Sequence, residues 1–557
     1  MEKKIEIYCL NNQSNITVEG GEKLLHIYNR LSLDKSLPAV TARVNNKSES
    51  LDFRVYNKCD IEFVDITDPS GMRAYIRSLC FVLYKAVEEL YPGTQLRIAH
   101  SVSNGNYCIL NNGDTPIEPE VVAALRIRMS QIIERDIPFE QCMAHTDEVI
   151  EIFEKQGLPA KVELLRTTGD LYTTYYMLDG LADIYYSWLV PSTGYLKVFD
   201  LQGYANGLLL LPPDKNRPTQ IATPIKQEKM LKAFNQYTQF NLILGIDGVG
   251  KLNRSIDNGD ASTLIQVAEA LHEKQIAAIA DEIAERFEKD GARIVLISGP
   301  SSSGKTTFSK RLSVQLMTNR LIPAPISLDD YFVNRVNTPI DENGDYDYES
   351  LYALDLKRFN SDLTRLLAGE CVELPTYDFK SGSRVETGKC LQLTPRTVLI
   401  LEGIHALNPE LTASISDKQK FRIYASALTS LSIDAHNWIP STDNRLLRRI
   451  VRDAKTRGVT PRDTIARWPS VRRGEDRWIF PYQENADAMF NSSLLFELAV
   501  IRDYAIPVLR SVSRNCPEYA EAARLLKFLH YFRSLPVKEI PPTSLLREFL
   551  GGSSFKY

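Results

Sequence analysis

The feature that most constrains the fold is a glycine-rich loop between an apolar run and a helix-forming stretch. Residues 294–297 read Ile-Val-Leu-Ile, the continuous apolar pattern of a strand buried in a parallel sheet. Residues 299–307 read Gly-Pro-Ser-Ser-Ser-Gly-Lys-Thr-Thr and fit the pattern GxxxxGK[ST]. Strand, loop and helix follow in the order that a phosphate-binding loop requires, so we predict a nucleoside triphosphate site in an α/β domain.

The residue types in this loop suit polyphosphate binding. Glycine lets the backbone curl so that successive amides face phosphate oxygens, and the helix start adds its positive dipole end. Lys305 is expected to neutralise the β and γ phosphates, and the Thr306 hydroxyl to ligate Mg²⁺. A Gly/Ser-rich connection without a ligand is the alternative. The predicted ATP-binding residues of the loop are Gly299, Ser301, Ser302, Ser303, Gly304, Lys305, Thr306 and Thr307.

Two later segments place acids at the ends of predicted strands, where open α/β sheets face their ligand crevice. Asp329 and Asp330 follow the first of these strands, and a carboxylate there can accept the proton of an attacking hydroxyl. Asp329 is therefore the predicted catalytic base, with helix capping as the alternative. Glu402 ends the apolar run 398–401 and is predicted to lie near the Mg²⁺; a simple turn acid is its alternative.

A group of arginines follows. It comprises Arg445, Arg448, Arg449, Arg452 and Arg457. The first four share one face at helical spacing, and such a cluster can close over a triphosphate and stabilise transferring charge. We predict a catalytic role for Arg452 and ATP binding by Arg448 and Arg457; a solvated basic face is the alternative.

Together these stretches resemble the uridine kinase/phosphoribulokinase family over residues 293–510. The matching positions are the loop 299–307, Asp329, Asp330, Tyr331, Asp347, Tyr377, Asp378, Phe379, Ser383, Arg384, Glu402, Gly403, Arg448, Arg449, Arg452, Asp453 and Arg457. The resemblance implies a P-loop kinase that uses ATP and Mg²⁺, with the acid at position 329 activating the acceptor hydroxyl. It also implies an acceptor site, formed by Asp347, Tyr377, Phe379 and Arg384.

Three positions depart from the uridine–cytidine kinase pattern. Gly382 stands where those kinases carry a base-reading histidine, Glu349 belongs to a Tyr-Glu pair in place of His-Pro, and Phe332 shifts the tyrosine of an aromatic pair by one position. The first expectation is transfer to the 5′-hydroxyl of a nucleoside. The alternatives are a phosphosugar or other small alcohol as acceptor, or an RNA- or nucleotide-responsive binding protein with a vestigial kinase.

The N-terminal half carries two other resemblances. Residues 1–66 resemble a TGS domain, a β-grasp module, and residues 72–211 resemble the editing domain of threonyl- and alanyl-tRNA synthetases, through the stretches 86–93, 104–107, 137–140 and 190–194. That editing domain holds zinc with an HxxxH pair and a CxxxH pair. The four positions fall here on Arg77, Phe81, Tyr185 and Leu189. Phenylalanine and leucine offer no donor atom, so we predict no zinc and no aminoacyl-ester hydrolysis. This half is expected to contact RNA, an effector or a partner, or to be structural.

At 557 residues the chain is too long for one hydrophobic core. The predicted fold is multidomain α/β, with a β-grasp domain at 1–66, an α+β editing-like domain at 67–211, a helical connector at 212–291 and a parallel-sheet kinase domain at 292–557. Within these, the patterns predict strands at 4–8, 40–44 and 61–66, helices at 22–31 and 72–90, and a mostly helical stretch at 226–290.

Composition narrows the class further. The net charge of −4 carries no global basic excess of the kind that marks nucleic-acid binding. The eight cysteines are scattered without a CxxC pair, so neither a zinc ribbon nor a disulfide framework is indicated. The apolar runs are shorter than a membrane span, and the N-terminal residues do not read as a secretory signal. We expect a cytoplasmic protein that forms a homo-oligomer.

Overall fold

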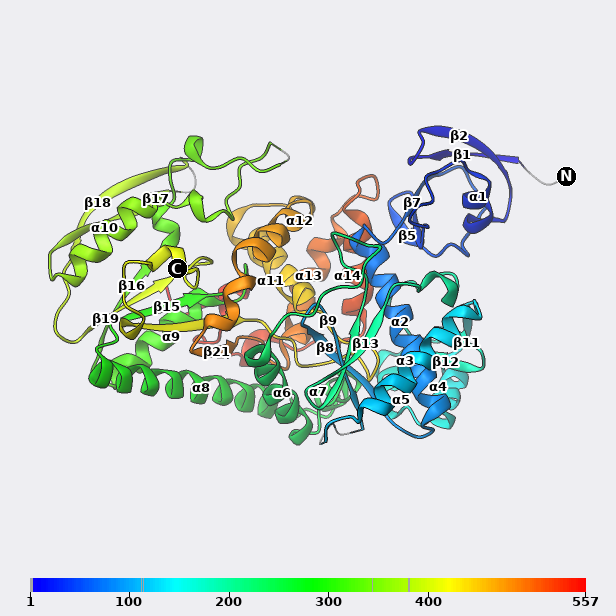
Figure 1. The fold of residues 1–557 in the computed structure, drawn as a ribbon, viewed down its shortest axis with the longest axis horizontal. Helices are drawn as coiled ribbons and strands as arrows, with labels where there is room; N and C mark the ends of the chain where they lie inside the picture. Colours follow the sequence, from blue (N-terminus) through cyan, green and yellow to red (C-terminus); the bar gives the residue numbers. More distant parts are fainter. Residues whose placement is uncertain (1–3, 112, 114, 343, 379–380, 557) are drawn as a thin grey trace.

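In the computed structural model, residues 4–111, 113, 115–342, 344–378 and 381–556 are described. The fold is multidomain α/β, and Figure 1 shows a small N-terminal sheet, a larger α+β part and a second α/β part built on a parallel sheet. Among the described residues, no helix combines the length and apolar character needed to cross a bilayer.

The N-terminal sheet has the strand order β2-β1-β7-β4-β5. Its strands are β1 (Lys4–Cys9), β2 (Ser14–Glu19), β4 (Thr41–Val44), β5 (Lys47–Glu49) and β7 (Asp60–Val64). The same region contains a separate two-stranded sheet of β3 (Glu22–Lys23) and β6 (Arg54–Val55), and helix α1 (Leu24–Arg30). The three predicted strands are confirmed, because alternate side chains such as Ile5 and Ile7 enter the core. The predicted helix begins only at Leu24, since the two residues before it pair with β6.

The next part places a long helix, α2 (Pro69–Leu90), among two antiparallel sheets. One sheet has the order β13-β14-β9-β8, from β8 (Leu96–Val102), β9 (Gly105–Leu110), β13 (Asp200–Tyr204) and β14 (Gly207–Leu211); the other is β10 (Glu140–His145), β11 (Tyr172–Leu178) and β12 (Leu181–Asp183). The remaining helices are α3 (Pro119–Glu134), α4 (Thr146–Lys155) and α5 (Pro159–Thr168). Helix α2 starts where the Asp68 side chain accepts a hydrogen bond from the Ser70 amide, and it is buried along most of its length.

The predicted helical stretch at 226–290 is confirmed as α6 (Glu228–Ile243), α7 (Val249–Asp257) and α8 (Ala261–Asp290). Helix α8 ends at Gly291, whose φ of 72° is left-handed, and the chain then enters a parallel sheet. Figure 1 shows α8 (green) running beneath that sheet, where Ile276, Ala280 and Ile283 pack in its core.

In this sheet all neighbouring strands are parallel, and the strand order is β16-β19-β15-β20-β21. Its strands are β15 (Ile294–Ser298), β16 (Ile322–Ser327), β19 (Thr397–Glu402), β20 (Lys420–Ser426) and β21 (Ala488–Asn491). The helices of this part are α9 (Lys305–Thr318), α10 (Leu356–Leu367), α11 (Ser441–Arg452), α12 (Pro461–Trp478), α13 (Glu497–Arg510), α14 (Tyr519–His530) and α15 (Arg547–Leu550). All five residues of β15 are buried, as its unbroken apolar run predicts.

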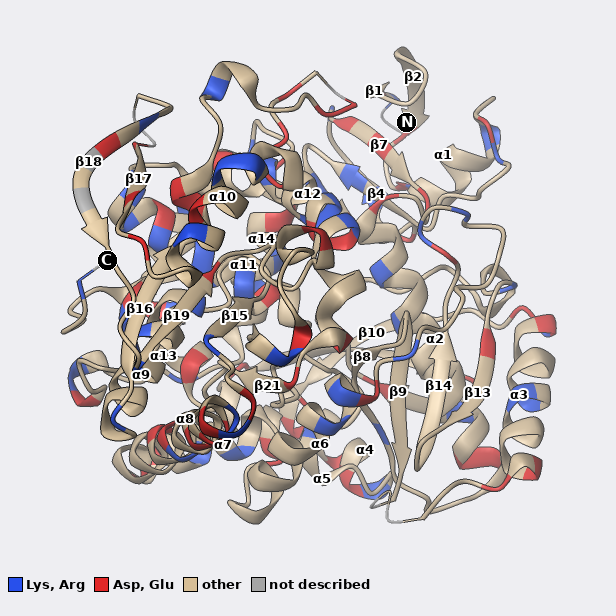
Figure 2. Cartoon of the chain, turned by 60° about the vertical axis from the view of Figure 1, so that its left-hand side comes forward, with Lys and Arg blue, Asp and Glu red and all other residues tan. Residues whose placement is uncertain are grey.

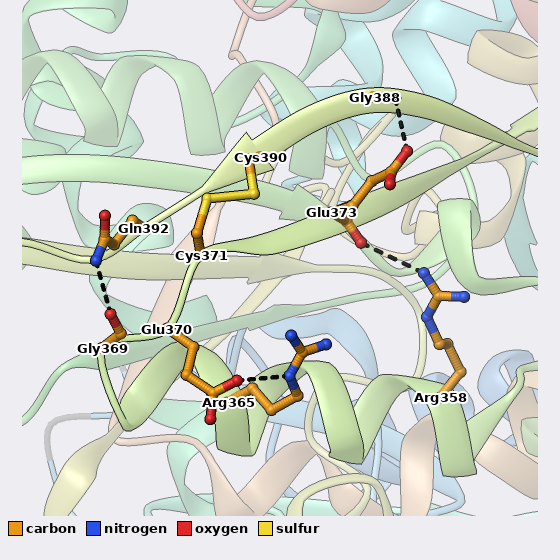
Figure 3. Close-up of a disulfide and its surroundings, with 9 residues drawn as sticks. All are labelled: Arg358, Arg365, Gly369, Glu370, Cys371, Glu373, Gly388, Cys390 and Gln392. Atoms are coloured by element: carbon orange, nitrogen blue, oxygen red, sulfur yellow. Dashed lines mark hydrogen bonds and ion pairs between the residues drawn. A yellow bond between two sulfur atoms is a disulfide. The ribbon is translucent and has the colours of Figure 1, made fainter.

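A hairpin of β17 (Val372–Asp378) and β18 (Ser383–Leu391) extends from this part. Figure 3 shows a disulfide between Cys371 and Cys390 at its base, with Cα atoms 5.7 Å apart. The sequence indicated no disulfide framework, because the cysteines are scattered. The Cys371–Cys390 disulfide corrects that expectation for this one pair. It is the antiparallel register of the two strands, not the 19-residue separation, that brings the sulfur atoms together.

A buried polar cluster joins the N-terminal α+β part to the part built on the parallel sheet. Lys161 of α5 lies 2.5 Å from Asp183 and 2.8 Å from Asp434, and all three side chains are almost fully buried. His436 Nδ1 lies 2.7 Å from the second oxygen of Asp183. Two regions that are far apart in the sequence are therefore held by ion pairs that water does not screen.

Candidate active site

The predicted site residues gather at one edge of the parallel sheet. Ile297 of β15 and Ser327 of β16 both pair in register with Glu402, the last residue of β19. The loop that follows β15, the acids that follow β16 and Glu402 therefore leave the sheet at neighbouring carboxyl ends. This edge is where open α/β sheets bind their ligands.

The loop after β15 has the geometry of an anion cradle. Helix α9 begins at Lys305, immediately after Gly304 with a φ of 80°, and Ser302 is also left-handed at 58°. A Cβ at Gly299 would collide with the Ala425 carbonyl of β20, so glycine is required there. The Ser302 and Ser303 hydroxyls are buried and have no hydrogen-bond partner within the described part of the chain. Unsatisfied hydroxyls beside a helix N-terminus fit an anionic ligand.

The two predicted magnesium ligands lie next to each other. The Thr306 hydroxyl donates to Glu402 Oε2 at 3.3 Å. Desolvation raises the pKa of Glu402 to about 7, while Lys305 opposes the rise and the nearby Asp329 adds to it. A hydroxyl and a carboxylate are oxygen donors of the kind that Mg²⁺ prefers, so these side chains fit that ion.

Asp329 lies in a 3₁₀ turn, Leu328–Tyr331, directly after β16. The residue is exposed, but desolvation by the neighbouring protein atoms raises the pKa of its carboxyl above the ordinary value. The charges of Lys305, Arg457 and Arg452 oppose that rise. The predicted base, the loop lysine and two of the predicted arginines are thus close enough to act on one another electrostatically.

The neighbouring acid has a different position. Asp330 Oδ1 accepts a hydrogen bond from the Tyr377 amide at 3.2 Å and so ties the turn to β17. Asp330 is thus tied to a backbone donor and partly buried, whereas Asp329 is exposed.

Helix α11 brings its arginines to the phosphate loop. Arg445 donates to the Ser301 carbonyl at 3.1 Å, Arg449 donates to the Ser301 hydroxyl at 2.8 Å, and Arg448 donates to the Ser302 carbonyl at 3.3 Å. The shared face predicted from their spacing therefore points at the loop. Figure 2 shows that acidic and basic residues are interspersed around α11 and α12.

These arginines differ in how much they are committed to protein partners. Arg448 is fully buried and pairs with Glu497 through two nitrogens, so a protein carboxylate already compensates its charge while it contacts the loop backbone. Arg452 and Arg457 lie near Asp453, at the start and end of a turn of π-helix, Asp453–Arg457. Arg457 is about half exposed. Of the predicted arginines, these two are the ones that act on Asp329.

The predicted acceptor residues lie on the hairpin and the loop beside it. Tyr377 of β17 is buried against Phe332, with ring centroids 5.6 Å apart, and pairs across the hairpin with Arg384. Arg384 is joined to Asp355 at 2.9 Å. Asp347 is half-buried and accepts a hydrogen bond from the Glu349 amide. Phe379, the fourth predicted residue, lies outside the described residues.

Three further acids reach this site, and the sequence patterns did not indicate them. Glu475 of α12 is buried, pairs with Arg445 and accepts a hydrogen bond from the Ser301 amide at 3.0 Å. Glu548 of α15 accepts hydrogen bonds from Thr307. Desolvation and the charge of Glu475 raise the pKa of Glu349 to about 7. Of these three acids, only Glu349 stood out in the sequence, because it belongs to the Tyr-Glu pair that replaces His-Pro, and no role was assigned to it.

The four editing positions are filled by side chains that pack together. Arg77 stacks on the Tyr186 ring at 4.1 Å, Phe81 packs against Tyr185, and Leu189 is buried. The Tyr185 hydroxyl donates to Asp183 of the buried polar cluster at 2.9 Å. A separate cavity of about 740 Å³ lies nearby, lined by residues such as Tyr84, Arg97, Gln239 and Asp247.

Comparisons with known proteins divide the chain in the same way. A family model described as phosphoribulokinase / uridine kinase matches residues 294–495. The uridine kinase of Macrococcus caseolyticus is 31% identical over 195 residues, which are 35% of this chain and 85% of that protein. A structure described as a possible uridine kinase from Bacillus stearothermophilus aligns with 19% identity and a TM-score of 0.24, over 36% of this chain and 88% of that one.

The N-terminal half is similar to a different class of enzyme. The threonine–tRNA ligase of Clostridium kluyveri is 28% identical over 197 residues, which are 35% of this chain. The matched part spans 31% of the length of that ligase.

Proposed function

Because the chain belongs to the phosphoribulokinase / uridine kinase family, we propose that it transfers the γ-phosphoryl group of ATP to the 5′-hydroxyl of a nucleoside. The observation that carries this proposal is the convergence of the phosphate loop, Asp329 and Glu402 at one edge of the parallel sheet. A phosphate grip alone would serve any nucleotide-binding protein. A free carboxylate across the crevice supplies the acceptor side of a kinase.

In this proposal each residue has a defined part. The loop amides and Lys305 hold the β and γ phosphates, while Asp329 accepts the proton of the attacking hydroxyl. Arg452 and Arg457 neutralise charge on the transferring group. Thr306 and Glu402 would hold Mg²⁺, which would supply positive charge to neutralise the phosphates. Asp347, Tyr377 and Arg384 position the acceptor.

An acceptor that carries a phosphate is the second candidate, and one observation favours it. A Cβ at Gly382 would lie 2.7 Å from Nε of Arg335, so this guanidinium takes the space that a side chain at position 382 would need. Arg335 also donates its backbone amide to the Gly382 carbonyl at 2.8 Å. A second cation near Arg384 suits a phosphosugar better than a neutral nucleoside.

The remaining proposals concern the setting of the reaction. We place the protein in the cytoplasm, in nucleoside salvage, as a homo-oligomer. The similarity to threonine–tRNA ligase in the N-terminal half supports a proposal that this half contacts RNA or a nucleotide effector. The substitutions at the four metal positions support its being unable to hydrolyse aminoacyl esters.

An acceptor screen tests the proposed function. The purified protein is incubated with γ-labelled ATP, Mg²⁺ and pools of nucleosides, phosphosugars and other small alcohols, and labelled products are separated. We expect a nucleoside 5′-monophosphate. Transfer only to a phosphosugar would favour the second candidate, and Arg335→Ala should then raise KM for that acceptor by about tenfold or more. No transfer to any pool, with tight RNA binding, would contradict the kinase proposal.

A further inference from the structure

A segment far away in the sequence lies against the phosphate loop. Residues 541–550 include α15, and Glu548 is 241 positions from Thr307, which it contacts. Figure 1 shows the chain returning from the helices at the centre to end over the kinase sheet, near β16 and α9. Leu545 and Phe549 are fully buried in the apolar cluster that also contains Phe308 of α9. The contact is therefore part of the packed core of this region.

The backbone of the loop accommodates this segment closely. A Cβ at Gly304 would collide with the Leu545 side chain. The last glycine of the phosphate loop therefore serves two purposes, because its φ of 80° suits the turn and its missing side chain leaves room for Leu545.

Glu548 uses hydrogen-bond donors that belong to the anion site. Its Oε2 accepts from the Thr307 amide at 3.2 Å and from the Thr307 hydroxyl at 2.7 Å. Thr307 lies in the first turn of α9. The amides of a first turn have no acceptor within their own helix and can donate to an anion. The Glu548 carboxylate therefore accepts hydrogen bonds from donors of the kind that suit a phosphate oxygen.

The same segment engages two arginines of α11. Arg452 lies 3.8 Å from Glu548, and the Phe549 ring lies 5.0 Å from the Arg448 guanidinium and 5.9 Å from that of Arg452. Lys455 donates to the Leu550 carbonyl. One short segment thus binds both the phosphate loop and the helix whose arginines face that loop.

We propose that residues 541–550 form an autoinhibitory strap, in which Glu548 occupies phosphate-binding donors and ATP must displace it. The inference rests on the proposed function because it requires the loop to bind ATP. The Glu548 carboxylate and a phosphate group cannot both accept a full hydrogen bond from the Thr307 amide. If both were held beside this amide, their like charges would also repel each other. When the strap leaves, Arg452 loses Glu548 and keeps only Asp453 as a carboxylate partner, so its charge becomes more available to the transferring phosphate.

Removal of the Glu548 charge tests the strap by binding alone. The dissociation constant of ATP with Mg²⁺ is measured by titration calorimetry on the full chain, for wild type, Glu548→Gln and Glu539→Gln. Glu539 lies close by in the sequence and is exposed, so it is the matched control. We expect about tenfold tighter binding for Glu548→Gln, the value of one charged hydrogen bond, and no change for Glu539→Gln. Inorganic tripolyphosphate should show the same difference, because the competition is for phosphate.

Hydrogen exchange supplies a second readout that needs no substitution. In wild type, saturating ATP should speed exchange of the amides of residues 544–550, since the strap is displaced. Equal or weaker ATP binding by Glu548→Gln, or slower exchange of these amides with ATP, would overturn the strap and leave the kinase proposal standing. A wild type and variants that all fail to bind ATP would overturn both.

Discussion

Asp329 and Asp330 show at the scale of single residues how adjacent identical side chains acquire different roles. The turn after β16 directs one carboxylate to the Tyr377 amide and leaves the other exposed, within reach of the charges of Lys305 and two arginines. The local pattern presents the two acids as equivalents, and only the family resemblance singled out Asp329. The structure distinguishes them because one is already used by a backbone donor.

Substitution of the open acid separates nucleotide binding from transfer. Asp329→Asn keeps the size of the side chain but removes the proton acceptor, so we expect kcat to fall by about 10²–10⁴-fold. ATP binding should remain or become slightly tighter, because a negative charge leaves the phosphate site. Turnover and calorimetry are measured on the same preparation.

The control for this prediction is Asp417→Asn. Asp417 is exposed in the turn before β20, at the opposite edge of the sheet, and its substitution should leave kcat unchanged. Near-full activity in Asp329→Asn would remove this residue from the role of base. Equal losses in both variants would point to general damage to the protein.

At the scale of elements, the sequence predicted those features that depend only on residues close together in the chain. The apolar run of β15, the glycine-rich loop and the spacing of the α11 arginines each lie within a few residues, and each has the predicted form. The contacts of Glu475 and Glu548 join positions 174 and 241 residues apart, so no local pattern contains them. The Cys371–Cys390 bond likewise depends on a hairpin register that the spacing of cysteines does not encode.

Helix α11 offers a test of which arginines support the loop and which face the nucleotide. Arg448→Met leaves Glu497 buried without its cation, and we expect a loss of about 3–5 kcal/mol in stability, seen as a lower thermal midpoint. Arg457→Met removes a half-exposed charge, so the midpoint should stay within the error while phosphoryl transfer slows.

Circular dichroism melts and the transfer assay, run on both variants, decide between these roles. A stable Arg448→Met protein with weakened ATP binding would assign Arg448 directly to the nucleotide. An Arg457→Met protein with unchanged turnover would remove Arg457 from the proposed site.

At the scale of the whole molecule, the buried polar cluster of Lys161, Asp183, Asp434 and His436 links the editing-like part to the kinase part. Lys161 lies between two carboxylates from different regions of the chain, and its side chain is fully buried. Ion pairs of this kind add little net stability over an apolar contact, but removing one partner leaves an uncompensated charge away from water. The N-terminal half is similar to threonine–tRNA ligase and the C-terminal half to uridine kinase, and neither similarity predicted a buried junction between the two halves.

Lys161→Met tests this junction. The substitution leaves two buried carboxylates facing one another without a cation, and we expect about 3–5 kcal/mol of destabilisation, measured as a lower urea midpoint. Lys155→Met, on the exposed face of the adjacent helix α4, is the matched control and should change stability by less than about 0.5 kcal/mol. Burial raises the pKa of Asp183, but Lys161 and His436 together hold it down to about 2, so the variant that lacks Lys161 should also respond differently to pH. Wild type gains stability from this carboxylate above pH ~4 and loses that contribution as pH falls toward ~2, whereas Lys161→Met should lose less over the same range. Parallel stability–pH curves for the two proteins would show that Lys161 does not lower the pKa of Asp183.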